Sequence, residues 1–146
     1  MEELTVLVTR QDGIPVPAYA TPLSSGMDLH ASLTRPAVLR PLERMLIPTG
    51  LSISIPGGYE GQIRPRSGLA LRHGITVLNS PGTIDSDYRG EIKVILVNLS
   101  SDPYTVNDGD RIAQIIFSPF ARARMETVEA LPPTERGEGG FGSTGQ

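Results

Sequence analysis

The sequence predicts an all-β fold. Short runs rich in valine, isoleucine and leucine recur along the chain, and turn-forming residues separate them, with 16 glycines and 13 prolines among 146 residues. Short β-forming runs between turn residues are typical of β-sandwiches and barrels. Glycine and proline make up about a fifth of the chain, below the roughly 25–30% that indicates disorder. The length suits one domain with one hydrophobic core.

The first half of the chain contains several runs that we expect to form strands. In the run of residues 51–56, the alternate apolar residues would share one face, because side chains alternate along an extended chain. Three prolines between residues 15 and 22 predict an irregular segment, and Thr49 with Gly50 is expected to join two strands. The predicted strands are residues 4–9, 44–48, 51–56 and 59–65.

The second half should complete about ten short strands and contains one convincing helix. Ser67 is a good N-cap, and Gly74 suits the position just past the helix end. The run from Val94 to Val97 is apolar on both faces, so we expect sheet or a neighbouring subunit to cover both sides. The further predicted strands are residues 92–99, 111–117 and 124–128.

Composition excludes several functions. The formal net charge is −3, with 13 basic and 16 acidic residues in no long blocks, so bulk binding to nucleic acid is not expected. The absence of cysteine excludes disulfides and thiolate metal sites, and it suits a cytoplasmic location. We see no apolar run near 18 residues and no secretory leader, so no association with a membrane is expected.

The most informative stretch is residues 79–91, which we expect at the tip of a hairpin between two β-forming runs. It is longer than a turn that only reverses the chain, and it holds Asp85, Asp87, Tyr88 and Arg89. A positioned carboxylate can activate water or hold Mg²⁺ through water, and a tyrosine ring offers a flat wall to a sugar or base. A solvated acidic turn, with Arg89 paired to an aspartate, would fit the same residues.

Two further segments suit anion binding. Arg66, Ser67 and Gly68 lie at the expected helix start, where backbone amides, a guanidinium and a hydroxyl can meet a phosphate. An ordinary capped helix with a surface arginine would look the same. Residues 109–114 begin a strand after a turn, and Gln114 could reach a phosphate, although turn chemistry alone explains most of this segment.

The composition changes from Pro132 onward, and we divide the chain into a β domain, residues 1–131, and a glycine-rich tail, residues 132–146. The tail cannot add to the core and should be mobile until it binds something. Its arginine and hydroxyls suit phosphate, and its phenylalanine can stack on a flat base. A simple disordered tail remains the alternative. The tail residues concerned are Arg136, Phe141, Ser143 and Thr144.

Together these segments resemble the trimeric deoxyuridine triphosphatase (dUTP diphosphatase) family. Its five motifs occur in order and at fitting spacing, and the resemblance covers essentially the whole chain. Thr83 stands where an aliphatic residue is commoner, and Ser25 where alanine is usual, but neither departure weakens the resemblance. The matching segments are residues 26–29, 65–70, 82–91, 109–114 and 136–145.

The resemblance implies a jelly-roll β-fold, a homotrimer with active sites shared between subunits, and hydrolysis of dUTP to dUMP and pyrophosphate. It implies that Asp85 activates the water and that Mg²⁺ is held chiefly by the triphosphate, with Asp28 an outer-shell partner through water. Tyr88 would pack against the deoxyribose and Asn79 would read uracil. The full set of implied substrate-binding residues is Arg66, Ser67, Gly68, Asn79, Gly82, Thr83, Ile84, Tyr88, Lys93, Gln114, Arg136, Phe141, Gly142, Ser143 and Thr144.

Three other functions fit parts of the pattern. One is a dCTP deaminase, or a bifunctional deaminase–diphosphatase, on the same fold. The others are a regulatory protein that binds nucleotide without catalysis and a purely structural jelly-roll assembly. The Asp85 hairpin and the complete glycine-rich tail favour the hydrolase over all three.

Overall fold

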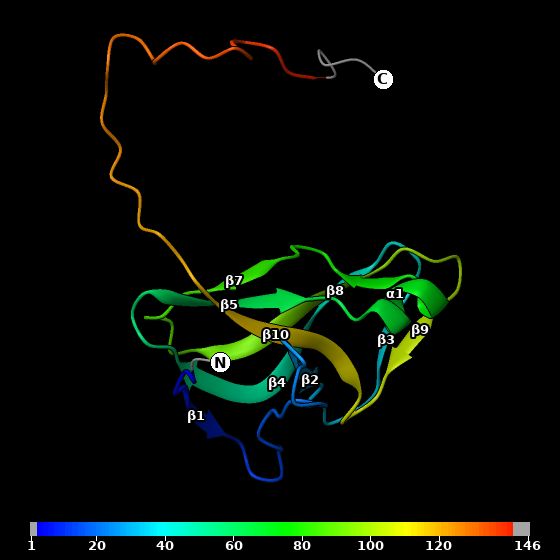
Figure 1. Cartoon of the computed structure of the whole chain (residues 1–146). Helices are drawn as coiled ribbons and strands as arrows, with labels where there is room; N and C mark the ends of the chain where they lie inside the picture. The colour runs from blue at the N-terminus through cyan, green and yellow to red at the C-terminus, as the bar shows by residue number, and fades with distance from the viewer. Residues whose placement is uncertain (1–2, 142–146) are drawn as a thin grey trace.

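A computed structural model describes residues 3–141, and two four-stranded antiparallel sheets form its body (Figure 1). The first sheet has the order β1 (Leu7–Arg10), β4 (Arg44–Ser54), β8 (Glu91–Asn98), β6 (Ile75–Val77). The second has the order β2 (Met27–His30), β10 (Arg111–Pro119), β5 (Tyr59–Arg64), β7 (Gly82–Ile84). A small sheet pairs β3 (Ala37–Leu39) with β9 (Tyr104–Val106), and α1 spans Ser67–His73. The predicted all-β, jelly-roll-like fold with one short helix is confirmed.

The core lies between the two large sheets because alternate residues of their strands turn toward each other. Ile92, Val94 and Leu96 of β8 are almost completely buried, and so are Ile63 and Ile115 from the facing sheet. The outer face of β8 is covered only in part. Across that face, residues 46, 95 and 78 form an apolar row, in which Leu46 is 55% and Leu78 50% exposed.

Two predicted local features differ from the structure. Thr49 and Gly50 do not join two strands, because β4 is continuous and only shifts register between Pro48 and Ser52. Thr49 Oγ1 donates to Ile92 O at 2.6 Å and Gly50 has φ 69°, which makes this a bulge within one strand. Arg66, rather than Ser67, is the extended N-cap residue of α1, without a side-chain cap, whereas Gly74 ends the helix as predicted.

The predicted strand at residues 124–128 is wrong for the single chain. Beyond β10, residues 120–141 are mostly irregular with a few turns and bends, and they lead away from the body (Figure 1). A strand needs a neighbour for its backbone groups, and none of the described residues pairs with this segment. The first strand also begins later than predicted, at Leu7. No helix within residues 3–141 has the length and apolarity needed to cross a membrane.

Asn98 joins the small sheet to the body, so we expect Asn98→Ala to destabilise the fold. Its fully buried amide donates to Leu39 O at 3.0 Å and Asp102 O at 2.8 Å, and its oxygen accepts from Ser100. The substitution leaves these groups unpaired, at about 1–3 kcal/mol for each buried group. Urea unfolding should show a loss of about 3–5 kcal/mol. Asn107→Ala, at an exposed turn position, is the control and should change stability by less than about 0.5 kcal/mol.

Candidate active site

One groove, of about 490 Å³, lies beside the connection between β6 and β8. The predicted hairpin exists, since β6 and β8 pair antiparallel, but its tip contains β7, which pairs with β5 of the other sheet. The tip therefore bridges both sheets, and Asp85 follows directly at the end of β7. The predicted site residues that line this groove are Asn79, Gly82, Thr83, Ile84, Asp85, Tyr88 and Lys93.

Hydrogen bonds fix the tip of this hairpin. The amide of Tyr88 donates to Asp85 O at 3.1 Å, and the Tyr88 hydroxyl donates to Glu91 O at 3.0 Å. Arg89 Nη1 donates to Ser86 O at 2.7 Å and to Tyr88 O at 2.9 Å. Arg89 thus holds backbone carbonyls and does not pair with an aspartate, as a simple acidic turn would require. The exposed Asp85 side chain forms no ion pair with the described residues, so its carboxylate is available to a water or a ligand.

A second groove, of about 370 Å³, contains the predicted phosphate-binding residues. Asp28 on β2 holds two guanidinium groups, with Arg66 Nε 3.0 Å from Oδ1 and Arg111 Nη1 3.3 Å from Oδ2. Two cations around one carboxylate leave a local excess of positive charge, which suits an anionic ligand. The groove is lined by Ala20, Ser24, Ser25, Gly26, Asp28, Arg66, Ser67, Gly68, Arg111 and Gln114.

Gln114 on β10 ties this second groove together. Its Nε2 donates to Pro65 O at 3.0 Å, which holds the residue before Arg66 against β10. Its amide oxygen lies so close to Gly26 that a β-carbon there would be 2.5 Å away.

Tyr104 on β9 is a titratable group near Arg66. Burial raises the pKa of the Tyr104 phenol, Asp110 raises it further, and Arg66 opposes the shift. Tyr104 is therefore neutral at physiological pH and adds no charge beside Arg66.

The two grooves share no lining residue, so one chain does not bring the predicted site together. The described part of the tail, residues 132–141, lines neither groove. Arg136 Nε donates to Gly139 O at 2.7 Å within the tail itself, and Phe141 is fully exposed. The remaining predicted tail residues, Gly142, Ser143 and Thr144, lie outside the described residues.

Sequence reasoning missed two charged residues of these grooves. Arg111 pairs with Asp28, and Glu91 accepts from the Gly50 amide at 2.9 Å while lying 3.8 Å from Lys93 Nζ. Both residues begin a strand whose other residues are largely apolar. A charge at the start of an apolar strand, within one of the five matching segments, was the available signal for each.

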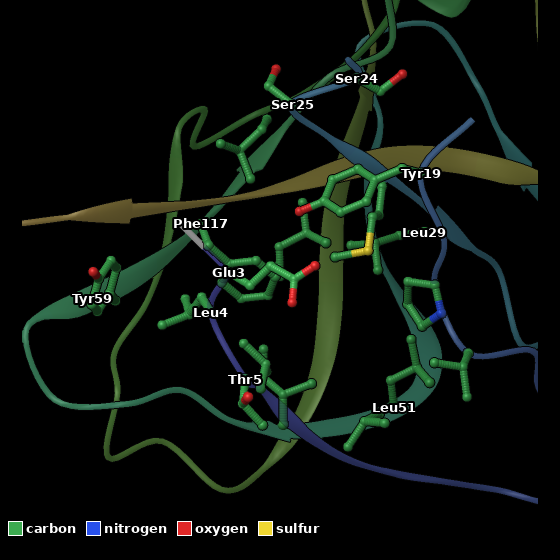
Figure 2. Close-up of a pocket in the computed structure, with 18 of the residues that line it drawn as sticks. Glu3, Leu4, Thr5, Tyr19, Ser24, Ser25, Leu29, Leu51, Tyr59 and Phe117 are labelled. Carbon is green, nitrogen blue, oxygen red and sulfur yellow. The ribbon is translucent and has the colours of Figure 1, made fainter. Parts of the chain in front are cut away.

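A third groove, of about 810 Å³, contains none of the predicted site residues. It opens between the N-terminal segment with β1 and the segment leading into β2, and Leu29, Leu51, Tyr59 and Phe117 line it (Figure 2). Because β1 and β2 are edge strands of the two large sheets, this groove lies between two sheet edges, and only an isolated bridge from Tyr19 to Met27 pairs with β2 there. Its lining is mostly apolar, which suits a protein segment better than a charged ligand.

An arginine-rich groove that suits phosphate, and a separate groove that holds an aspartate beside a tyrosine, are the parts that a nucleotide phosphohydrolase needs. The dUTPase family model matches residues 12–145, and the chain belongs to the dUTPase family. A deoxyuridine 5′-triphosphate nucleotidohydrolase from Wolbachia pipientis subsp. Culex pipiens is 60% identical over 91% of this chain and 88% of its own. One from Fusobacterium nucleatum is 52% identical over the full length of both.

A solved structure supports the same assignment. The dUTPase of Staphylococcus bacteriophage 80alpha with dUpNHpp superposes on this chain with a TM-score of 0.87 at 26% identity. The match covers 97% of this chain and 99% of the phage chain. The resemblance that the five motifs indicate is therefore confirmed over the whole fold.

Proposed function

We propose that the protein hydrolyses dUTP to dUMP and pyrophosphate by attack of water at the α-phosphorus. This reaction would keep uracil out of DNA and supply dUMP for thymidylate synthesis. Membership of the dUTPase family makes the protein a dUTP-hydrolysing enzyme. The observation that carries the chemistry is Asp85, whose unpaired carboxylate shares one groove with Asn79 and Tyr88.

Each groove would bind one end of the substrate. Beside Asp85, the Tyr88 ring would pack on the deoxyribose, and Asn79 with the hairpin backbone would read the uracil edge. Cytosine presents a donor where uracil presents an acceptor, so a fixed pattern of backbone groups rejects it. In the other groove Arg66 and Gln114 would hold the phosphates, together with Ser67. Positioning and charge stabilisation of this kind supply most of the rate in phosphoryl transfer.

The residues fit Mg²⁺ held mainly by the substrate. No group of three or more metal-ligating side chains occurs within residues 3–141. An ion that arrives with the substrate would take its ligands from phosphate oxygens and water. Asp28 would reach such an ion through water, because both of its oxygens already accept from arginines. Bound Mg²⁺ would neutralise charge on the triphosphate.

The active enzyme would be a homotrimer with sites between subunits. Support comes first from the two separate grooves, since a complete site needs both of them. The partly exposed apolar row on β8 and its neighbours, residues 46, 78 and 95, would gain cover from another copy. Residues 120–131 would then fill the groove of Figure 2 in a neighbouring copy, where the strand predicted at 124–128 would find its partner. The exposed apolar side chains of that segment are Phe120, Met125, Val128 and Leu131.

Mixing two inactive variants tests the shared site. Asp85→Asn and Arg66→Ala each damage a different groove, so trimers refolded from both would contain some sites with two intact halves. Random assembly at equal amounts should restore about a quarter of the wild-type sites. Sedimentation of the same samples should show trimers. No recovery of activity on mixing would contradict the shared site.

A substrate panel tests the reaction. The purified protein with Mg²⁺ should release pyrophosphate and dUMP from dUTP and leave UTP, dCTP and dTTP largely intact. Release of ammonia from dCTP would instead indicate a deaminase. Tight dUTP binding without turnover would indicate a regulatory protein.

Gly26→Ala should weaken substrate binding without unfolding the protein. The new methyl group would push the Gln114 amide away from Pro65 O and loosen the loop that presents Arg66. We expect kcat/KM for dUTP to fall about 10- to 100-fold, roughly one or two lost hydrogen bonds to a charged ligand. In a Gln114→Ala background the same change should add little, because the clash is gone. A large extra loss there would show that Gly26 acts by another route.

A further inference from the structure

We propose that Gly90 is a positioning residue for sugar discrimination, because its missing side chain lets Tyr88 fold back against the hairpin. The proposal rests on the proposed function, in which Tyr88 forms the wall beside the deoxyribose. The family resemblance assigns no chemical role to Gly90, and Gly90 does not line the groove that contains Asp85.

The Tyr88 ring occupies the space that a side chain at residue 90 would need. A β-carbon added to Gly90 would lie 2.6 Å from Cζ of Tyr88 and 3.0 Å from its Cε2, and nearer still to the phenol oxygen. Carbon atoms pack at about 3.5–4.0 Å, so ring and methyl group cannot both keep these positions. Either the ring or the backbone of the tip must move.

The ring is the part that would move. Gly90 does not have a positive φ, so its backbone accepts alanine without strain. The tip backbone is held by Arg89, which donates to the carbonyls of Ser86 and Tyr88. The Tyr88 side chain is 44% exposed and is held by one hydrogen bond, from its hydroxyl to Glu91 O at 3.0 Å. Turning the ring out toward solvent is therefore the least costly response.

A fixed ring can exclude a 2′-hydroxyl, and a displaced ring cannot. Ribose and deoxyribose differ by a single oxygen atom, so the Tyr88 ring must keep its position when a 2′-hydroxyl is present. Contact with the Gly90 backbone on one side and the bond to Glu91 O at the ring's end provide this rigidity. Losing the contact should relax selectivity before it lowers stability.

The test compares kcat/KM for dUTP and UTP in the full-length enzyme. Gly90→Ala should reduce the dUTP:UTP ratio at least about tenfold, by lowering activity on dUTP and raising it on UTP. Gly57→Ala is the matched control, since a β-carbon there has no atom within 4 Å and Gly57 also lacks a positive φ. It should leave the ratio unchanged. An unchanged ratio in Gly90→Ala would overturn the proposal.

Two further variants separate positioning from a general structural effect. In a Tyr88→Ala background, Gly90→Ala should change the ratio less than twofold, and a large additional effect would contradict action through Tyr88. Tyr88→Phe keeps the ring but loses the bond to Glu91 O, so its dUTP:UTP ratio should lie between those of the wild type and Gly90→Ala. This variant also tests the proposal if Gly90→Ala folds poorly. An unchanged dUTP:UTP ratio in Tyr88→Phe would contradict the proposal that a fixed Tyr88 ring excludes UTP.

A crystal structure of Gly90→Ala distinguishes failure of this inference from failure of the proposed function. If the wild-type protein did not hydrolyse dUTP, the proposed function would fail by itself. The position of the Tyr88 ring in the variant would still decide the inference, because a ring left against residue 90 would overturn it.

Discussion

Asp85→Asn should lower kcat for dUTP by about 10²- to 10⁴-fold, the usual contribution of a general base. Asparagine keeps the size of the side chain and can still accept a hydrogen bond from water, but it cannot take up the proton. The groove shape and the phosphate-binding residues stay unchanged, so the Kd for dUTP should change less than about threefold. Steady-state kinetics and calorimetric binding of a non-hydrolysable dUTP analogue measure the two quantities.

Asp87→Asn provides a control in the same turn. Asp87 lies two residues away and is also exposed, but it does not line the groove. Removing its charge changes the local field by the same amount without touching the proposed base, so kcat should remain within about twofold of wild type. Normal turnover in Asp85→Asn, or equal losses in both variants, would refute Asp85 as the base.

Much of the fold was predictable because its signals are local. Alternating apolar residues predicted most strands, and Gly74 predicted the end of the helix, since a left-handed residue there favours glycine. The bulge at Thr49 and Gly50 was not predictable, because the same two residues also suit a turn. Pairing with β1 and β8, together with the bond from Thr49 Oγ1 to Ile92 O, 43 residues away, makes the strand continuous.

The residues of the candidate site were predictable only where they are close in sequence. The hairpin residues around Asp85 are close in sequence and also share a groove, so the motif predicted their proximity. Arg111 was missed because its partner Asp28 is 83 residues away, and only the pairing of β2 with β10 brings them together. The predicted strand at 124–128 failed for a related reason, because a strand signal cannot tell whether the partner lies in the same chain.

Deleting residues 136–146 should reduce kcat/KM for dUTP at least about 100-fold while leaving the trimer intact. The described residues of this segment, 136–141, line neither groove, and Arg136 bonds within the tail. The proposed contribution arises only on binding, when Arg136 and the hydroxyls of the tail would hold the terminal phosphate. Phe141 would cover the base and exclude water. The fifteen residues of the whole tail, 132–146, can span at most about 50 Å, which allows the tail to reach a site on a neighbouring subunit.

The assembly and the chemistry separate in this experiment because they depend on different segments. Residues 120–131, which we propose to pack on a neighbour, remain in the truncated protein, so sedimentation should still give a trimer. Glu138→Gln in the full-length chain is the control, since it alters tail charge but none of the proposed contacts, and it should keep nearly full activity. Full activity in the truncated protein would refute the lid, whereas dissociation into monomers would show that the tail itself holds the subunits together.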